Sequence, residues 1–234
     1  MVGAVDILVN NAGGSLHTPQ HFLDESDAHW DAVMGLNLTA AVRMCRLALP
    51  GMIERRYGRI VNMASLAALV PAPAGHTLYA ACKALIVKFS EALGNEVRPF
   101  GVHVTALCPG FTRSEFHDVT GTRALVQKMP RWLWIDADTV AREGFDAVMA
   151  GMSIQVPGRI NRLIVLLSRL LPQRLLVAMG RPRLSEERLG SLGGRPKPHW
   201  SLRPRSIEQR ETVLPVPTDP RSARLQVRHH LSIR

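Results

Sequence analysis

The sequence contains few of the residues that build metal centres or disulfide frameworks. Its 234 residues include three cysteines, Cys45, Cys82 and Cys108, which lie far apart and form no C-x-x-C pair. The nine histidines show no metal-ligand spacing either. Widely separated cysteines argue against disulfides and zinc sites and favour a reducing compartment. We therefore expect no metal site and a cytoplasmic location.

We expect no signal peptide, and the sequence has no long apolar run. The opening stretch MVGAVDILVNNAGG soon turns polar and Gly-rich, unlike a secretory leader. No unbroken apolar run approaches the roughly 18 residues that cross a bilayer, so we expect no transmembrane segment. Hydrophobic residues make up 46% of the chain and charged residues 21%, which is typical of a globular protein with one sizeable core.

The positive charge is concentrated at one end of the chain. The formal net charge is +10, but residues 181–234 hold 12 Lys/Arg and 5 Asp/Glu, a net charge of +7. Residues 1–180 hold the other 17 basic and 14 acidic residues, a net charge of +3. Seven of the 16 prolines also fall beyond residue 180, without a helical or strand period. We expect a catalytic domain at 1–180, a disordered basic tail at 181–234 and no nucleic-acid partner.

Apolar runs of strand length alternate with amphipathic stretches along residues 1–180. Strands are predicted at 6–9, 58–65, 102–110 and 153–156, and helices at 26–56, 77–98 and 138–151. The first helix contains Gly35 and Pro50–Gly51, either of which is a candidate interruption. This order predicts an α/β fold with a doubly wound, Rossmann-like parallel sheet and helices on both faces.

A last helix is predicted from residue 159 onward, in the stretch INRLIVLLSRLLPQRLLVAM. Arg162, Arg169 and Gln173 fall on one helical face, opposite a face of Leu, Ile and Val. This pattern favours a terminal helix that covers the core or forms a dimer seam, with attachment to a membrane surface as the alternative.

Tyr79 and Lys83 are the clearest candidates for a reacting pair. They stand four residues apart near the start of the predicted helix 77–98, so they share one face of that helix. A tyrosine protonates a developing alkoxide if its pKa of about 10 is lowered, and a nearby ammonium group stabilises the phenolate. The spacing therefore indicates metal-free carbonyl chemistry; the alternative is an exposed ion-dipole pair on a solvated helix.

Further motifs occur in a fixed order around this pair: NNAG at 10–13, GLNL around Asn37, GRIVNMAS ending at Ser65, and CPG at 108–110 followed by Thr112. In order and spacing, residues 4–180 resemble the short-chain dehydrogenase/reductase family. The resemblance implies that Tyr79 is the acid and base of the reaction and that Lys83 lowers its pKa. It also implies that Ser65 binds the substrate oxygen and that Asn37 supports a water in a proton relay.

The same resemblance implies a cofactor, NAD or NADP. Asn10, Ala12 and Gly13 match the family's segment beside the adenosine half, whereas Pro109, Gly110 and Thr112 match the segment near the nicotinamide. Lys83 would hold the nicotinamide ribose, next to Tyr79. Each assignment has a structural alternative: Ser65 as a strand-end residue, Asn37 as a helix-bending residue, Asn10 as a turn residue and Thr112 as a helix cap.

The sequence departs from the family at its start. The family begins with a strand, a Gly-rich turn that receives the cofactor pyrophosphate, and a helix, and two further strands normally precede NNAG. We expect a sheet that lacks these first three strands and the Gly-rich loop. A start assigned too late, a truncated gene remnant, or completion of the sheet by another chain would each explain this, and we favour the first two.

The expected function is an oxidoreductase that interconverts an alcohol and a ketone or aldehyde by hydride transfer. The alternative is a non-catalytic family remnant or binding protein. Residues 70–76 and 111–135, including Trp132 and Trp134, are expected to line a pocket for a small apolar substrate. Family members usually form homo-oligomers, which the resemblance implies here too.

Overall fold

The computed structural model describes residues 4–16, 22–72, 75–114, 129–172 and 174–175. The chain divides into two units, Met1–Arg183 and Leu184–Arg234, and every described residue lies in the first. The predicted domain boundary at residue 180 and the predicted basic tail therefore lie outside the described residues.

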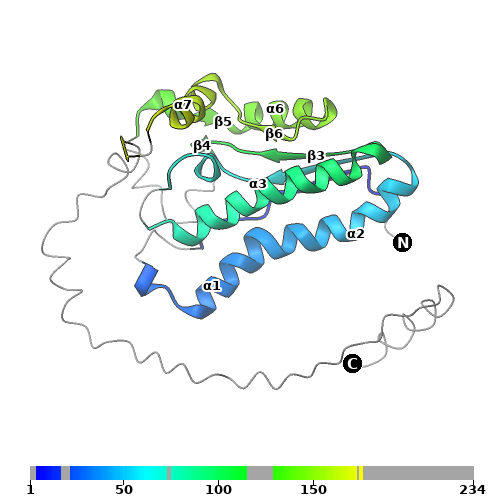
Figure 1. Cartoon of the computed structure of the whole chain (residues 1–234), viewed down its shortest axis with the longest axis horizontal. Coiled ribbons are helices and arrows are strands. Elements are labelled where there is room, and N and C mark those ends of the chain that lie inside the picture. Colours follow the sequence, from blue (N-terminus) through cyan, green and yellow to red (C-terminus); the bar gives the residue numbers. More distant parts are fainter. Residues whose placement is uncertain (1–3, 17–21, 73–74, 115–128, 173, 176–234) are drawn as a thin grey trace, which may run out of the picture. The chain divides into compact units, whose positions relative to one another are not determined.

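Four parallel strands form the centre of the fold, in the order β1-β2-β3-β6. Their bounds are Ile7–Asn10 for β1, Gly58–Met63 for β2, Val102–Leu107 for β3 and Ile154–Gln155 for β6. Helices connect them: α1 (Asp27–Met34), the π-helical segment η2 (Gly35–Thr39) and α2 (Ala40–Glu54), then α3 (Thr77–Val97), then α6 (Ala137–Met149). The predicted Rossmann-like α/β fold is thus confirmed (Figure 1).

The remaining elements are short, apart from one helix. They are η1 (Phe22–Asp24), η3 (Leu66–Ala68), η4 (Arg98–Phe100), η5 (Arg131–Leu133), α7 (Arg159–Leu170), and the two-residue parallel strands β4 (Thr112–Arg113) and β5 (Ile135–Asp136). Thr112 therefore belongs to a strand, and the helix-cap alternative for this residue is wrong.

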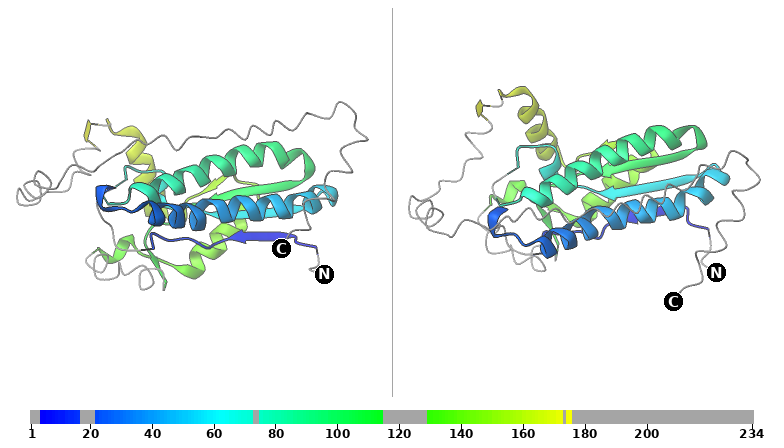
Figure 2. Two further views of the ribbon diagram at one scale, coloured as in Figure 1. Left: turned by 90° about the horizontal axis from the view of Figure 1, so that it is seen from below. Right: turned by 60° about the horizontal axis from the view of Figure 1, so that its bottom comes forward.

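One face of the sheet, which we call the closed face, is covered by α2 and α3 (Figure 2). Alternate side chains of the strands point to this side because successive residues of a strand face opposite ways. Ile60 and Val104 pack there with Met52 of α2, and all three are almost fully buried. Ile86 of α3 continues this core toward the carboxyl ends of the strands.

The opposite side, which we call the open face, is covered only in part. Helix α6 packs on β2 and β3, where Val61 and Leu107 meet Val140 and Val148. Beside them on β1, Ile7 is 42% exposed and Val9 is 55% exposed. Parallel sheets are normally covered on both faces, so this apolar strip is an exception within the described residues.

A buried polar network ties the closed face together. Asn62 of β2 accepts a hydrogen bond from Asn10 Nδ2 at 2.7 Å and donates one to Ser90 Oγ of α3 at 2.9 Å. Asn10 Nδ2 also lies 3.4 Å from Cys45 Sγ of α2. Buried polar groups need such partners, because leaving one unpaired costs about 1–3 kcal/mol. The network therefore fixes β1, β2 and both helices relative to one another.

The α1–α2 region also bears on membrane attachment. Taken as one helix, Asp27–Glu54 is long and apolar enough to cross a bilayer by length and composition. Polar residues interrupt it, so it contains no unbroken apolar run of that length. One such helix is weak evidence, since the core helix of a water-soluble protein meets the same criterion. Here Val33, Cys45 and Met52 of this region are buried within the fold.

Candidate active site

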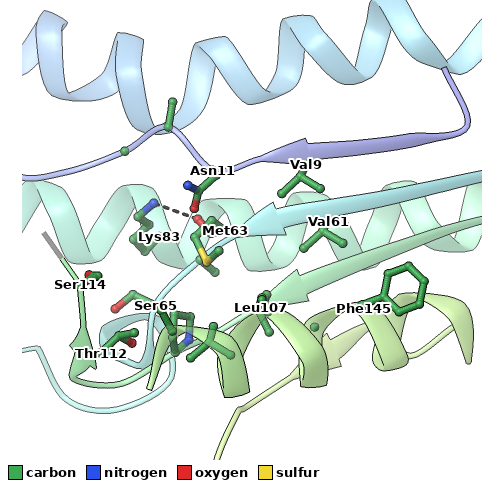
Figure 3. Close-up of a pocket in the computed structure, with 18 of the residues that line it drawn as sticks. Val9, Asn11, Val61, Met63, Ser65, Lys83, Leu107, Thr112, Ser114 and Phe145 are labelled. Carbon is green, nitrogen blue, oxygen red and sulfur yellow. Dashed lines mark hydrogen bonds between the residues drawn. The ribbon is translucent and has the colours of Figure 1, made fainter. Parts of the chain in front are cut away.

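A pocket of about 970 Å³ opens at the carboxyl ends of the strands and continues along the open face. Its polar wall comes from the loops after the strands and from α3 (Figure 3). Its apolar wall comes from the open face and α6. The lining includes Asn11, Ala12, Gly13, Met63, Ser65, Tyr79, Lys83, Pro109, Gly110, Thr112, Ser114, Val9, Val61, Leu107 and Phe145.

Ser65 is held at the end of β2 by the backbone around it. It is extended and caps η3, with its Oγ accepting a hydrogen bond from the Ala67 N–H at 3.2 Å. The N–H of Leu66 donates to the Pro109 carbonyl at 2.8 Å, which joins this turn to the loop after β3. The Ser65 hydroxyl also hydrogen-bonds the Tyr79 side chain. Ser65 thus lines the pocket beside Tyr79 as well as capping a turn.

Lys83 is buried with only 3% of its surface exposed. Its ammonium donates to the Met63 carbonyl at 2.9 Å and lies 5.6 Å from the centroid of the Tyr79 ring. Burial lowers the pKa of Lys83 to about 8. Lys83 is therefore buried and Tyr79 is partly buried at the pocket, so the alternative of an exposed pair on a solvated helix is wrong.

The pKa of Tyr79 is raised, whereas catalysis by a tyrosine needs a lowered pKa. Burial raises this pKa above its ordinary value, and the hydrogen bond with Ser65 offsets only part of the rise. The net direction is upward because desolvation of the phenolate outweighs the opposing hydrogen bond. The lowering of the Tyr79 pKa by Lys83 stays a prediction.

Asn37 lies in the π-helical segment η2 and is buried. Its Nδ2 donates to the carbonyls of Gly14 at 2.8 Å and Val33 at 2.9 Å, and its Oδ1 accepts from the Gly14 N–H at 3.0 Å. Asn37 is not among the residues that line the pocket. It holds the loop after β1 in place, and so it contacts the site through Gly13 and Gly14.

Gly13 has no side chain at the point where this loop meets Lys83. A Cβ atom at Gly13 would lie 2.8 Å from Lys83 Nζ and 2.9 Å from Asn37 Oδ1. Real Cβ atoms rarely approach other atoms so closely, so glycine is needed here for close approach rather than for an unusual backbone angle. The loop, Asn37 and Lys83 therefore form one packed unit.

Asn10 does not belong to the pocket. Its amide points to the closed face and joins the network with Asn62 and Cys45. The assignment of Asn10 to the cofactor site is therefore corrected to a structural role. Its neighbour Asn11 lines the pocket instead. The period of two along β1 is the signal that separates them, because Leu8 and Asn10 face one way and Val9 and Asn11 the other.

The loop after β3 brings Pro109, Gly110 and Thr112 to the pocket. Their position near a nicotinamide stays a prediction. Thr112 Oγ1 donates to the Gly110 carbonyl at 3.1 Å. A Cβ at Gly110 would lie 2.7 Å from Asn161 Oδ1, so α7 packs tightly against this loop. Ser114, which the sequence analysis did not single out, adds a hydroxyl to the same wall.

The expected substrate-binding residues are largely absent from this pocket. Trp134 packs against Phe111 with the two rings tilted and their centroids 5.7 Å apart. Trp132 is 60% exposed. Neither tryptophan lines the pocket, nor do the described residues of 70–76. Residues 73–74 and 115–128 lie outside the described residues.

Other catalytic chemistries find little support in the described part of the chain. No group of three or more His, Cys, Asp or Glu side chains there is arranged to hold a metal ion. All three cysteines are buried. Burial raises the pKa of the Cys108 thiol to about 12, so it stays protonated near neutral pH.

Comparison with known proteins agrees with this geometry. A parallel sheet with a pocket at its carboxyl ends defines a Rossmann-type α/β protein. The sequence profile described as short chain dehydrogenase matches residues 1–124, more than half of the chain. The chain belongs to the short-chain dehydrogenase family.

Individual relatives give the extent of the similarity. The chain is 43% identical over 109 residues to D-beta-hydroxybutyrate dehydrogenase from Cupriavidus necator, covering 47% of this chain and 41% of the relative. A short-chain dehydrogenase from Streptomyces avermitilis is 27% identical with a TM-score of 0.59, over 82% of this chain and 72% of that one. The closed form of serine dehydrogenase complexed with NADP+ is 34% identical with a TM-score of 0.50, over 54% of this chain and 53% of that one. The chain spans less than half the length of the curated relatives it matches.

Proposed function

We propose that this chain supplies the catalytic residues of an oxidoreductase that interconverts an alcohol and a ketone or aldehyde, with NAD or NADP as the hydride carrier. The observation that carries the proposal is that Ser65, Tyr79 and Lys83 line one pocket. The relative named D-beta-hydroxybutyrate dehydrogenase and the NADP+ complex of serine dehydrogenase support the reaction type and the cofactor.

In the reductive direction Tyr79 gives its phenolic proton to the carbonyl oxygen as that oxygen gains negative charge. In the oxidative direction the phenolate takes the hydroxyl proton back. Ser65 donates a hydrogen bond to the same oxygen, and the Lys83 ammonium stabilises the phenolate that Tyr79 becomes. A positive charge close to a buried phenolate has a larger effect than in water, because the local dielectric is low.

The residues around Gly13 fit the ribose end of a nicotinamide cofactor. Gly13 and Lys83 both line the pocket, and they lie so close together that a Cβ at Gly13 would be 2.8 Å from Lys83 Nζ. In the proposal Gly13 and Lys83 hold the ribose hydroxyls, and Pro109, Gly110 and Thr112 border the nicotinamide. A bound nicotinamide supplies the hydride in reduction and accepts it in oxidation.

The decisive experiment replaces each of the chain's two tyrosines in turn. Tyr79→Phe is expected to lower turnover of a carbonyl substrate by at least about 100-fold, because the proton donor is lost. Tyr57→Phe, on the half-exposed residue that follows α2, serves as the matched control and leaves turnover unchanged. Thermal unfolding checks that both variants fold. Turnover that survives in Tyr79→Phe would contradict the mechanism.

A second candidate function is that of a non-catalytic binding protein that turns over no cofactor. One observation favours it. The apolar strip of β1 on the open face lines the pocket without being covered by another described element, and Val9 there is 55% exposed. Fluorescence titration of the chain with NADH and NADPH separates the two functions. Saturable binding supports the oxidoreductase, whereas a folded chain that binds neither nucleotide supports the non-catalytic alternative.

The substrate we propose is a small apolar carbonyl compound or alcohol. The support is the apolar wall of the pocket, where Val61, Leu107, Val140 and Val148 lie. Comparing kcat/KM for apolar and charged carbonyl compounds of similar size tests this. A preference for the charged compounds would contradict it.

A further inference from the structure

Helix α7 is attached to the fold by a narrow strip of its surface. Asn161 and Val165 are its buried residues. Asn161 Nδ2 donates to the Pro157 carbonyl at 2.8 Å, and its Oδ1 lies where a Cβ at Gly110 would be. These two residues are one helical turn apart, so they mark the inner side of the helix. The outer side is therefore left for another partner.

The outer side of α7 is apolar, and we call it the leucine face. Its residues stand at helical spacing opposite Val165. They are Ile160 (38% exposed), Leu163 (53%), Leu166 (53%), Leu167 (46%) and Leu170 (70%). Single exposed apolar residues are ordinary on protein surfaces, but a contiguous group on one helix indicates a contact surface.

The charged residues of α7 and of the stretch just after it have one sign. Residues 159–175 contain four arginines, Arg159, Arg162, Arg169 and Arg174, and no Asp or Glu. Arg162 forms an ion pair with Glu143 of α6 at 3.5 Å. The other three arginines form no ion pair with any residue that the structure describes. The surface thus combines apolar area with unpaired positive charge.

The length of α7 determines how this helix would be oriented at a membrane. Twelve residues make a helix of about 18 Å, which is shorter than the hydrocarbon core of about 30 Å. The helix therefore lies in the plane of an interface rather than across it. The neighbouring segment η5 packs against α7 and carries Trp132, which is 60% exposed. Exposed tryptophans are favoured at the level of lipid headgroups.

We propose that the leucine face of α7 attaches the protein peripherally to an anionic phospholipid surface, with the leucines among the upper acyl chains and the arginines at the phosphates. Charge decides between this partner and a second copy of the chain. Two leucine faces packed on each other would bury Arg159 of each copy, which stands four residues before Leu163 on the same face, and residues 159–175 offer no carboxylate to pair with it. Anionic lipid complements both the apolar and the basic part of the surface.

The position of α7 gives the attachment a link to the pocket. The inner side of the helix holds Gly110, a residue of the pocket wall, through Asn161. One helix therefore contacts the pocket wall on its inner side and lipid on its outer side.

The test is flotation of the full chain with vesicles of phosphatidylcholine, and with vesicles in which about a third of the lipid is phosphatidylglycerol. The triple variant Leu163→Ser/Leu166→Ser/Leu170→Ser removes apolar area without changing charge. This matters because residues 181–234 are also basic, with 12 Lys/Arg against 5 Asp/Glu. The control variant Leu47→Ser/Leu85→Ser changes exposed leucines of α2 and α3. Circular dichroism checks folding, and the single variant Leu170→Ser replaces the triple variant if that one does not fold.

The unmodified chain and the control are expected to float with the anionic vesicles and much less with the neutral ones. The leucine variant is expected to bind the anionic vesicles at least about tenfold more weakly. A variant with Arg159, Arg169 and Arg174 changed to Gln is expected to lose most of the preference for anionic lipid. Equal binding by the leucine variant and the unmodified chain would overturn the proposal, as would a folded chain that does not float. A leucine variant that turns a dimer into a monomer in sedimentation, without any vesicle binding, would overturn it in favour of a second copy.

Discussion

The closed and open faces of the same sheet differ in almost every respect. The closed face carries two helices, fully buried apolar side chains and a satisfied polar network of Asn10, Asn62 and Ser90. The open face carries α6 over two strands and leaves Ile7 and Val9 of β1 exposed. The closed face therefore holds most of the core, and the open face provides the space in which the pocket lies.

The candidate reacting side chains lie at the edge of the sheet where the closed face and the open face adjoin. Tyr79 and Lys83 come from α3, a helix of the closed face, but reach the pocket at the carboxyl ends of the strands. Lys83 is held by the Met63 carbonyl at the end of β2. The well-packed side of the sheet thus positions the candidate groups at its less covered side, which is the support that a functional site would need.

The sharpest test of this contrast uses two isoleucines on adjacent strands. Ile60→Ala on the closed face, where Ile60 is 0% exposed, is expected to lower the free energy of unfolding by about 3–4 kcal/mol. Ile7→Ala on the open face, where Ile7 is 42% exposed, is expected to lower it by less than about 1 kcal/mol. Urea denaturation measures both. Equal losses would break the contrast and mean that the open face is covered in solution.

Lys83, at the boundary between the faces, predicts a pH effect of known sign. Its pKa is about 8 in the folded chain against an ordinary value of 10.5. Between these two values the unfolded chain binds a proton that the folded chain does not, so stability rises with pH in this window. Relative to Lys83→Met, the chain is expected to gain up to about 3 kcal/mol from about pH 8 to about pH 10.5.

Urea denaturation of both chains across this window measures the gain. Taking the difference between them cancels the titration of the other groups. A difference that stays constant with pH would show that the Lys83 ammonium is not desolvated.

Two asparagines sharpen the contrast further. Asn62→Ala is expected to lower the free energy of unfolding by about 2 kcal/mol, because it removes the hydrogen bonds that join Asn62 to Asn10 and Ser90 in the core. Asn11→Ala, in the pocket wall, is expected to change stability by less than about 0.5 kcal/mol while weakening nucleotide binding. Thermal unfolding together with NADH titration reads out both effects. A loss of nucleotide binding in Asn62→Ala and a loss of stability in Asn11→Ala would contradict the roles assigned to the two residues.

The smallest expected effects come from one helical glycine on each face. Gly144→Ala in α6 would place a Cβ 2.5 Å from Leu107 Cδ2, and we expect a loss of about 1 kcal/mol. Gly94→Ala in α3 would meet Val104 only at ordinary distances of 3.5 and 3.6 Å, and we expect a gain of up to about 0.5 kcal/mol from helix propensity.

The double variant Gly144→Ala/Leu107→Ala tests the cause of the loss. Adding Gly144→Ala to Leu107→Ala is expected to be neutral or stabilising, because the close contact is gone. A persistent loss would place the cause in α6 itself.

The fold was largely predictable because its signals are local. The strands β1, β2 and β3 are largely apolar runs that are followed by polar or Gly and Pro residues, and α3 begins and ends within a residue of its predicted bounds. The i, i+4 spacing put Tyr79 and Lys83 on one helix face, the family resemblance implied Ser65 beside them, and all three line one pocket. Strand alternation separates Asn10 from Asn11, because successive residues along β1 face opposite sides of the sheet.

Other features depend on tertiary surroundings that no local pattern contains. The raised Tyr79 pKa results from burial by residues distant in sequence. The strand at Thr112 exists because Thr112 and Arg113 pair with Ile135 and Asp136. The exposure of Trp132, expected in the pocket, depends likewise on how η5 packs.

The π-helical segment η2 sets the rotational phase of the whole α1–α2 helix. Val33, Asn37, Ala41 and Cys45 are all buried at intervals of four residues. In an ideal α-helix each such interval advances the side chain by about 40°, so three intervals would turn Cys45 well away from Val33. The wider turn of η2 takes back part of this rotation. Deleting one residue between 35 and 39 would therefore do more than shorten the helix: it would rotate α1 relative to α2 and disengage Asn37 from Gly14.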